Sequence, residues 1–276
     1  MKRILFFETT DFTGATRVTQ TIKKIVGRHY ETRSTIITDL DNPEKEICEA
    51  IAKEQPDFLF SSFTSINPEV ITVGKENWLT VVIRQDYKLG DLTDATKQRI
   101  FKTYINADWV IAQTTEMKQE MLSCESLKNC RIKVIENPLD EEDIIEKAKA
   151  PNPFPDNGNF HFLWVGRRDP IKDLPTLQKA FEILHEDYPD TDLTLVSDDP
   201  NPYRWMKNAD CMIICSLSEA SPNTLREAIY LGTPVVSTDC SPTVRKLVHN
   251  SNICPIGDFE SLSLLMRRIL IQGKEL

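Results

Sequence analysis

The sequence predicts an α/β protein made of two doubly wound, Rossmann-like halves. Three observations support this prediction: short apolar runs of strand length recur along the chain, helical patterns separate them, and a Pro-rich stretch at 147–158 interrupts the alternation once. Strands that alternate with helices pair in parallel, because each helix returns the chain to the same edge of the sheet. A chain of 276 residues is long enough for two domains with cores of their own.

The first half is expected at 1–146 and contains six strand-like runs. They are Arg3–Phe7, Ser34–Thr38, Phe58–Ser62, Leu79–Arg84, Trp109–Gln113 and Ile132–Ile135. The intervening helical patterns include Ala15–Val26, Pro43–Lys53, Ala95–Ile105 and Thr115–Leu122. The stretch 147–158 follows, and its prolines and closing Asn-Gly are typical of an inter-domain linker.

The second half, at 159–276, repeats the alternation. Its strand-like runs are His161–Val165, Leu193–Ser197, Cys211–Cys215, Val235–Thr238 and Asn252–Cys254. Its helical patterns are Leu174–His185, Asn223–Leu231, Pro242–His249 and Phe259–Ile271. Parallel pairing of these strands brings their carboxyl ends to one edge of a second sheet.

The most informative segment is 218–239, which carries two carboxylates, Glu219 and Glu227, eight residues apart. Between them, Ser221-Pro222-Asn223-Thr224 is a helix-start signal, with Ser221 as a polar cap and Pro222 near the first helical position. Gly232-Thr-Pro ends this helix, and a strand follows. The order strand, acidic loop, helix brings both carboxylates and free backbone N–H groups to the carboxyl edge of the sheet.

Such an edge suits a ligand that carries both phosphate and sugar. Backbone N–H groups and the helix dipole favour a pyrophosphate, and a carboxylate accepts hydrogen bonds from sugar hydroxyls. A nucleotide sugar would use both kinds of group. The alternative from the residues alone is that Glu219 caps a turn and Glu227 is a solvated helix residue.

The segment resembles the E-x7-E signature of retaining glycosyltransferases with the GT-B fold, especially family 4 (glycosyl transferases group 1). The residues in register with the family pattern are Glu219, Pro222, Asn223, Glu227, Ala228, Gly232, Pro234, Val235 and Val236. Ala220 stands where the family usually has Gly, a small residue that still lets the backbone approach the donor.

A second match lies upstream, where the run 162–174 resembles the family's V-G-R-x-x-x-x-K-G segment. By this resemblance Gly166 is donor-binding, and Arg167 and Lys172 neutralise the donor diphosphate, as fixed cations beside a leaving group would. The alternative is a strand end followed by a charged surface loop. Arg168 is adjacent, but Arg167 directly follows Gly166 as in the family.

The resemblance thus implies a set of site residues. Arg167, Lys172 and Glu219 are expected to be catalytic, and the donor-binding set is Gly14, Gly166, Ala220, Ser221, Pro222, Asn223, Thr224 and Glu227. Gly14 enters through the run Thr13–Val18, which is similar to a shortened G-G-A-E-R-V loop of the family. The family's sugar-contacting His has no counterpart here, and Asp86 or Arg84 is expected in its place.

The resemblance implies two domains facing across a cleft and transfer of a hexose, with retention, from a UDP- or GDP-hexose to a glycan or lipid-linked acceptor. Surface polysaccharide or glycoconjugate synthesis of bacterial type is the expected setting. The chain is short for the family, and the segment after 193–200 is reduced, so the second domain is expected to be shortened. Two alternatives stay open: a donor-binding partner subunit without catalysis, and a non-transferring relative of epimerase or phosphorylase type.

Composition limits the remaining classes. A net charge of −9 argues against a nucleic-acid binder that relies on a basic surface. The start is too short and too soon acidic for a signal peptide, and no run reaches the roughly 18 apolar residues of a membrane span. We therefore expect a cytoplasmic protein, with peripheral contact at the inner membrane face left open. No cofactor or metal is expected, because the two D-x-D triplets at 39–41 and 190–192 arise easily in an acidic chain.

Overall fold

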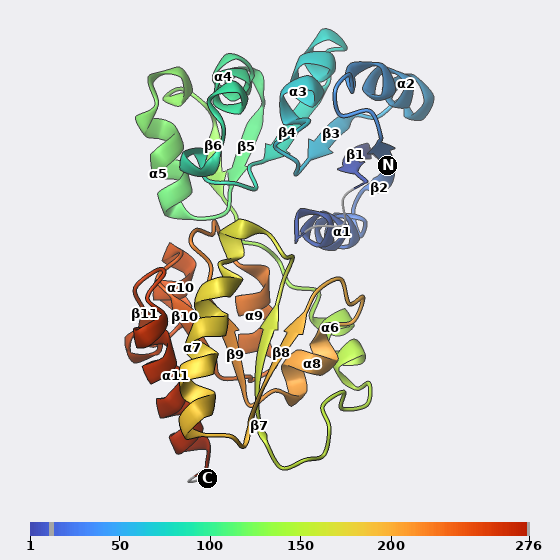
Figure 1. Ribbon diagram of the computed structural model, residues 1–276. Helices are drawn as coiled ribbons and strands as arrows, with labels where there is room; N and C mark the ends of the chain where they lie inside the picture. The colour runs from blue at the N-terminus through green and yellow to red at the C-terminus, as the bar shows by residue number, and fades with distance from the viewer. Residues whose placement is uncertain (11–13, 275–276) are drawn as a thin grey trace. The chain divides into compact units, whose positions relative to one another are not determined.

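The computed structural model describes residues 1–10 and 14–274, and these form two compact α/β units, Met1–Pro138 and Leu139–Leu276. Each unit is built around one parallel sheet (Figure 1). The predicted fold class is therefore confirmed for both halves. That the two halves face each other across a cleft stays a prediction.

The sheet of the first unit has six strands in the order β2-β1-β3-β4-β5-β6, all of them parallel. The strands are β1 (Arg3–Thr9), β2 (Glu31–Ile37), β3 (Phe58–Ser61), β4 (Thr80–Arg84), β5 (Trp109–Ala112) and β6 (Ile132–Val134). The helices are α1 (Gly14–Val26), α2 (Glu44–Glu54), α3 (Asn67–Glu76), α4 (Asp94–Thr103) and α5 (Thr115–Ser123), with short 3-10 turns η1 (Leu89–Asp91), η2 (Tyr104–Asn106) and η3 (Glu125–Leu127).

The sheet of the second unit has five parallel strands in the order β11-β10-β9-β7-β8. The strands are β7 (Phe160–Val165), β8 (Thr191–Val196), β9 (Cys211–Ile214), β10 (Val235–Thr238) and β11 (Ile253–Cys254). The helices are α6 (Glu141–Ala148), α7 (Leu174–Asp187), α8 (Tyr203–Asn208), α9 (Asn223–Tyr230), α10 (Pro242–Leu247) and α11 (Phe259–Lys274), with 3-10 turns η4 (Pro170–Lys172) and η5 (Asn250–Asn252).

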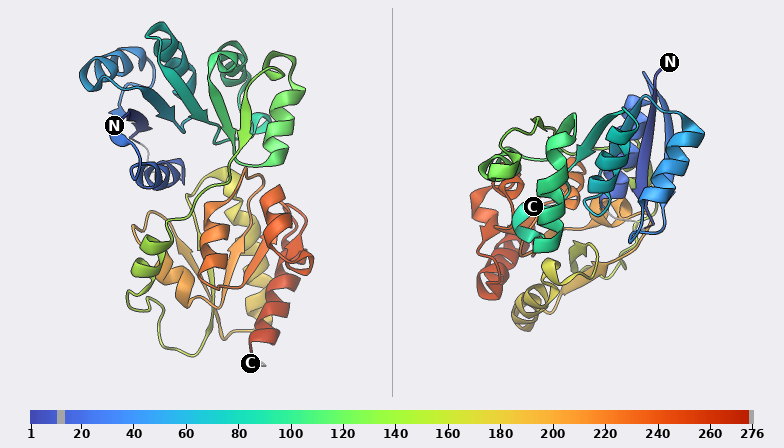
Figure 2. Two further views of the ribbon diagram at one scale, coloured as in Figure 1. Left: turned by 180° about the vertical axis from the view of Figure 1, so that it is seen from behind. Right: turned by 90° about the horizontal axis from the view of Figure 1, so that it is seen from above.

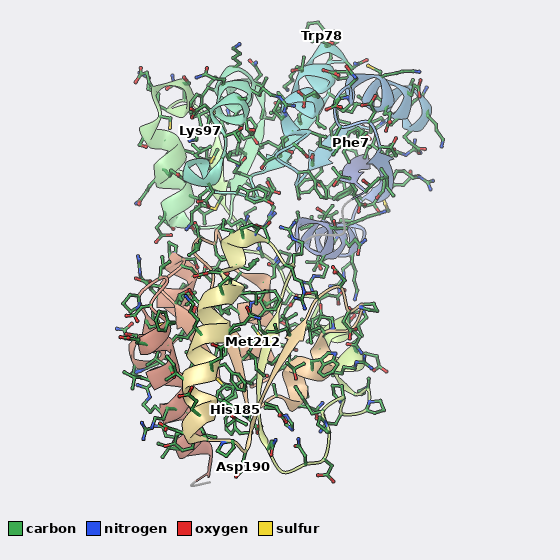
Figure 3. The ribbon with its side chains drawn as sticks, in the orientation of Figure 1. Phe7, Trp78, Lys97, His185, Asp190 and Met212 are labelled. Carbon is green, nitrogen blue, oxygen red and sulfur yellow. The ribbon has the colours of Figure 1, made fainter. Side chains whose placement is uncertain are left out.

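Both sheets are covered on both faces, which explains why their strands are apolar without alternation. In β1, the consecutive residues Leu5, Phe6 and Phe7 are all buried. In the second unit, α7 and α11 pack on one face, and α6, α8, α9 and α10 pack on the other, seen from behind in Figure 2. Figure 3 shows Met212 of β9 between these layers.

The boundary between the units lies earlier than the predicted one at 146, and the stretch 147–158 is not a free linker. Helix α6 belongs to the second unit, because Ile144 is 1% exposed and packs in the second core. Phe154 is buried in the same core and stacks on His161, with ring centroids 4.6 Å apart. The Pro-rich composition concealed this aromatic side chain, which ties the stretch to the second sheet.

The reduced segment of the second unit is visible between β8 and β9. The residues there, all of them described, form a single six-residue helix, α8. The second sheet is correspondingly one strand smaller than the first. The sequence prediction of a shortened second domain rested on this same segment between β8 and β9.

Candidate functional site

The strand order of the second sheet defines a topological switch point at the carboxyl ends of β7 and β9. Strand β8 follows β7 on one side, and the chain then crosses to place β9 on the other side of β7. The loops that leave β7 and β9 therefore diverge, and ligands of doubly wound sheets bind at such a switch point. The loop after β7 carries Arg167 and Lys172, and the loop after β9 carries Glu219.

Lys172 and Glu219 form an ion pair at this switch point. The Lys172 ammonium donates to Oε1 of Glu219, and the Ser216 hydroxyl donates to the same oxygen at 3.0 Å. The two charged side chains are 22% and 16% exposed, so their charges are partly shielded from water. A cation and a carboxylate of predicted function are thus held together at the edge of the sheet.

Backbone hydrogen bonds fix the two loops relative to each other. The Leu217 N–H donates to the Ile171 carbonyl at 2.8 Å, which joins the β9 loop to η4. The Asp169 carboxylate accepts from the Ile171 N–H at 3.1 Å and caps η4. These contacts leave Lys172 at the end of a closed turn, where its side chain meets Glu219.

Strand β10 supports the same loop from the other side. The Glu219 N–H donates to the Cys240 carbonyl at 3.0 Å, and the Thr238 hydroxyl donates to the Ser216 carbonyl at 2.7 Å. Glu219 is therefore fixed by backbone contacts as well as by its side chain. A carboxylate held in this way loses little freedom when it binds a ligand.

Two thiols lie beside the ion pair and are uncharged at neutral pH. Burial raises the pKa of Cys215 to about 12 and that of Cys240 to about 11, and the Glu219 charge adds to the rise at Cys240. The Cys215 thiol donates to the Lys172 carbonyl at 3.0 Å. All seven cysteines lie among the described residues, and none of them is in a disulfide bond.

Gly166 and Arg167 follow β7 directly. The Gly166 N–H donates to the Val196 carbonyl at 3.0 Å, and a Cβ at Gly166 would lie 3.0 Å from the Trp164 ring. A side chain at this position would therefore press on a buried Trp. Arg167 is exposed, and its guanidinium lies 3.9 Å from the Asp169 carboxylate, so its charge is available to solvent.

The segment 220–224 leads from Glu219 into α9, with Ala220, Ser221 and Pro222 buried. Its cap differs from the prediction. Pro222 is the N-cap residue and α9 begins at Asn223, so the N-cap position lies one residue after the predicted Ser221. The Ser221 hydroxyl accepts from the Thr243 hydroxyl at 3.3 Å. Because Pro has no side-chain oxygen, the first turn of α9 relies on other groups for its N–H donors.

The remaining donor-binding candidates of this helix differ in how deeply they are buried. Asn223 and Thr224 are half-buried in the first turn of α9. Glu227 is 4% exposed, one turn further on, and Oε1 of its carboxylate lies 3.5 Å from the Tyr203 hydroxyl of α8. The predicted end of the helix is confirmed, because Gly232 has φ +79 and the left-handed backbone that favours glycine.

Gly14 and Asp86 belong to the first unit. Gly14 is the first residue of α1, which leaves the sheet at its own switch point between β1 and β3, whereas Thr13 of the predicted loop lies outside the described residues. The half-buried Asp86 carboxylate accepts from the Thr64 N–H at 3.1 Å and from its hydroxyl. Burial raises the pKa of Asp86. The hydrogen bonds from Thr64 and the positive charge of Arg84 lower this pKa, but burial outweighs them.

Arg84, the alternative to Asp86, is 3% exposed, and its guanidinium donates to the Asn137 side chain. Burial lowers the pKa of Arg84 to about 10, so it stays charged at neutral pH. Of the two candidates, Asp86 is the more accessible to a ligand.

Sequence reasoning missed two residues that contact the candidates. Ser216 bonds Glu219, and its position at the end of an apolar run, three residues before Glu219, was a usable signal. Tyr203 approaches Glu227 from a helix that the sequence did not reveal.

Metal-binding side chains do not gather in groups of three His, Cys, Asp or Glu residues anywhere in the described part of the chain. Of the D-x-D triplets, Asp39 accepts from the Asp41 and Asn42 N–H groups in a turn, and Asp192 accepts from the Asn157 and Asn159 side chains. The helices over residues 14–274 are all too short or too polar to cross a bilayer.

Comparison with known proteins agrees with this geometry. Sucrose-phosphate synthase from Thermosynechococcus elongatus superposes with a TM-score of 0.78 at 14% identity, covering 99% of this chain and 91% of that one. Anabaena HepE in complex with UDP-glucose superposes with a TM-score of 0.73 at 14% identity, covering 100% and 91%. By its fold, with two parallel Rossmann-like sheets, the chain is of the GT-B class.

The sequence similarity to known families lies in the second unit. A sequence model of the family described as Glycosyl transferases group 1 matches residues 156–271, which include every candidate of the second unit. An uncharacterized glycosyltransferase of Methanocaldococcus jannaschii is 29% identical over 184 residues, 55% of this chain and 43% of that protein. The chain thus spans less than half the length of that curated relative. In this part of the chain, the protein is similar to the group 1 glycosyl transferases.

Proposed function

We propose that this protein is a glycosyltransferase that moves a hexose from a nucleotide sugar to a glycan or lipid-linked acceptor, with retention of anomeric configuration. The observation that carries the proposal is the Lys172–Glu219 ion pair at the switch point, beside Arg167 and the start of α9. The complex of Anabaena HepE with UDP-glucose supports a nucleotide-sugar donor. The setting we propose is bacterial-type synthesis of surface polysaccharide or glycoconjugate, in the cytoplasm or at the inner membrane face.

The cations act on the leaving group in this proposal. A departing nucleoside diphosphate gains negative charge, and Lys172 and Arg167 stabilise that charge in the transition state. Lys172 already holds its ammonium toward Glu219, whereas Arg167 is exposed and approaches from the end of β7. Because two cations serve the diphosphate, the proposed reaction uses no metal ion.

Glu219 and the start of α9 position the donor sugar and its phosphates. The Glu219 carboxylate accepts hydrogen bonds from sugar hydroxyls, and Ser216 and Lys172 hold it in place. The N–H groups of the segment 221–224 bind phosphate oxygens at the positive end of the helix. Gly166 and Ala220 are small, so the backbone comes close to the donor.

Glu227 receives the ribose hydroxyls. Its carboxylate lies beside Tyr203 in a site with little access to water, where a charged hydrogen bond is strong. On the first unit, Gly14 contributes a backbone N–H toward the donor phosphate, and Asp86 contacts the sugar.

The chemical step is a substitution on one face of the sugar. The acceptor oxygen forms a bond to the anomeric carbon while the bond from that carbon to the phosphate oxygen breaks. The acceptor proton passes to the leaving diphosphate, which departs on the same side. In this scheme the protein supplies cations and orientation rather than a covalent nucleophile.

The experiment is to measure nucleoside diphosphate release from UDP-, GDP- and ADP-hexoses with candidate acceptors, using Glu227→Ala as control. Release from one donor that is lost in the variant supports transfer and names the donor. Donor binding without release, with every acceptor, contradicts transfer and supports a binding subunit. Product formed without acceptor, or only with inorganic phosphate, contradicts transfer and supports a relative of epimerase or phosphorylase type.

A further inference from the structure

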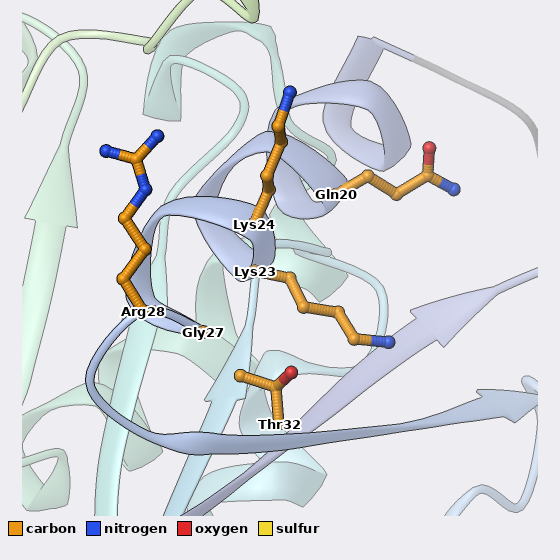
Figure 4. A pocket seen from close by; sticks show the side chains of 6 residues that line it. All are labelled: Gln20, Lys23, Lys24, Gly27, Arg28 and Thr32. Atoms are coloured by element: carbon orange, nitrogen blue, oxygen red, sulfur yellow. The ribbon is translucent and has the colours of Figure 1, made fainter.

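The first unit carries a pocket that the proposed function does not use. Its volume is about 480 Å³, and it is formed where the C-terminal half of α1 meets the start of β2 (Figure 4). The residues that line it are Gln20, Lys23, Lys24, Gly27, Arg28 and Thr32. The pocket is an open depression rather than an enclosed cavity, so a ligand in it stays in contact with water.

The charged residues of this pocket are all cations, although the whole chain has a net charge of −9. The acid that follows in sequence, Glu31, is bound by the Arg3 and Arg33 guanidinium groups at 3.1 and 2.8 Å. Glu31 therefore neutralises those two arginines rather than the pocket. A local concentration of positive charge on an acidic protein attracts an anion.

The cations are arranged around a polar floor. The Lys23 ammonium donates to the Ser34 hydroxyl, which directs this side chain toward β2. Figure 4 shows Lys24 and Arg28 extending together on another side of the pocket. The exposed Arg28 guanidinium makes neither a hydrogen bond nor an ion pair with any residue whose position is described, so its five donors are available to a ligand.

Gly27 keeps the floor of the pocket open. A Cβ at this position would lie 2.9 Å from the Lys23 carbonyl and 3.7 Å from the Thr32 hydroxyl. The close contact is with the last turn of α1, so a side chain at Gly27 would displace the part of the helix that carries Lys23 and Lys24.

Exposed apolar side chains occur close in sequence to the residues that line the pocket. Tyr30 is 37% exposed and packs edge-on against Phe58, with ring centroids 6.0 Å apart. The Lys2 ammonium lies 5.2 Å from the centre of the same Phe58 ring. Ile25 of α1 is 45% exposed. Cations beside exposed aromatic and aliphatic side chains suit an anionic group carried on an apolar body.

We propose that this pocket binds a phosphate group, carried either by an anionic lipid headgroup or by a soluble phosphorylated ligand. A phosphate presents several acceptor oxygens, which match the planar fork of Arg28 and the point charges of the two lysines. The site does not depend on the proposed transfer, because it lies within the first unit and uses none of the residues assigned to the donor.

The first experiment is co-sedimentation with phosphatidylcholine vesicles, with and without phosphatidylglycerol. Wild-type protein is expected to bind only the anionic vesicles, and the K24Q/R28Q double variant to bind them about 25-fold more weakly, since each cation contributes about 1 kcal/mol, roughly fivefold. The matched control is K45Q/K53Q, which removes two lysines of α2 that are 84% and 81% exposed. Glu219→Gln, which acts at the donor site, is expected to keep wild-type vesicle binding.

The second experiment titrates inorganic phosphate by calorimetry. Binding of phosphate that the double variant loses, without vesicle binding, supports the pocket and assigns it to a soluble ligand. Binding of both supports the pocket and assigns it to a lipid headgroup. The proposal is overturned if wild-type protein binds neither probe, or if the double variant and the control bind equally well.

Discussion

Lys172 and Glu219 form an ion pair although they are 47 residues apart in the sequence. The pair exists because β9 lies next to β7 in the sheet, so the loops after these two strands meet at one edge. Both charged side chains are partly buried, so water screens their attraction only in part. Loss of either partner leaves a charge without compensation at the proposed donor site.

Replacement of Lys172 by Met is expected to reduce kcat about 100- to 1,000-fold, because a preorganised cation beside the leaving group is lost. Lys172→Arg keeps the charge and is expected to retain part of the activity. The measurement is steady-state release of nucleoside diphosphate. Lys149→Met, at a side chain that is 65% exposed, is the matched control and is expected to behave as wild type. Equal rates for the two Met variants would contradict a catalytic role for Lys172.

The two adjacent arginines after β7 are expected to differ. Arg167→Ala is expected to lower kcat at least tenfold, since Arg167 directly follows Gly166 at the carboxyl end of the strand. Arg168→Ala, a change of the same size and charge at an exposed neighbour, is expected to leave kcat within about twofold of wild type. The kcat values of the two variants, measured side by side, show which arginine acts on the diphosphate. A larger loss of kcat in Arg168→Ala than in Arg167→Ala would assign this role to Arg168.

Glu227 is expected to recognise the ribose. Glu227 is 4% exposed, and Glu227→Gln keeps its side-chain volume. The Kd of this variant for UDP is expected to rise about tenfold, because a hydrogen bond to a charged group is lost. Wild-type protein should bind 2′,3′-dideoxy-UDP more weakly than UDP, and the variant should bind the two alike. Calorimetric titration gives both constants, with the exposed Glu186→Gln as control. If Glu227→Gln still binds UDP more tightly than 2′,3′-dideoxy-UDP by the wild-type factor, Glu227 does not recognise the ribose.

The stability of the first unit is expected to depend on Asp108 at acidic pH. Burial alone would raise the pKa of Asp108, but hydrogen bonds from the Lys75 ammonium and the Val81 N–H outweigh it, so the folded-state pKa is lowered. A carboxyl group with a lowered pKa stabilises the folded state at pH values above its unfolded-state pKa, about 3.9. This contribution is lost as the pH falls through the folded-state pKa.

Asp108→Asn is therefore expected to lower the Tm at pH 7 by several degrees, from a loss of about 1–3 kcal/mol. The difference from wild type should shrink as pH falls below about 4. Thermal unfolding at a series of pH values tests this, with Asp94→Asn, at a side chain that is 99% exposed, as control. A Tm difference that stays constant down to pH 3 would show that the carboxylate charge of Asp108 is not the cause.

The secondary structure and the local motifs followed from the sequence. Each predicted strand has a counterpart in a sheet, because apolar runs in doubly covered parallel strands differ strongly from the surrounding loops. Helices α3, α6 and α8 were not identified, since tertiary contacts outweigh weak local patterns. The boundary near 146 was wrong because Ile144 and Phe154 are apolar residues within otherwise polar or Pro-rich stretches.

The sequence by itself determined which residue types are present and in what local order, so it could predict Glu219, Glu227, Arg167 and Lys172 as candidates. Only the tertiary structure decided that Lys172 meets Glu219, while Glu227 turns toward Tyr203. It also decided that Pro222 rather than Ser221 precedes the helix. The physical reason is that strand order and packing, which depend on contacts between distant residues, determine which loops meet at the edge of a sheet.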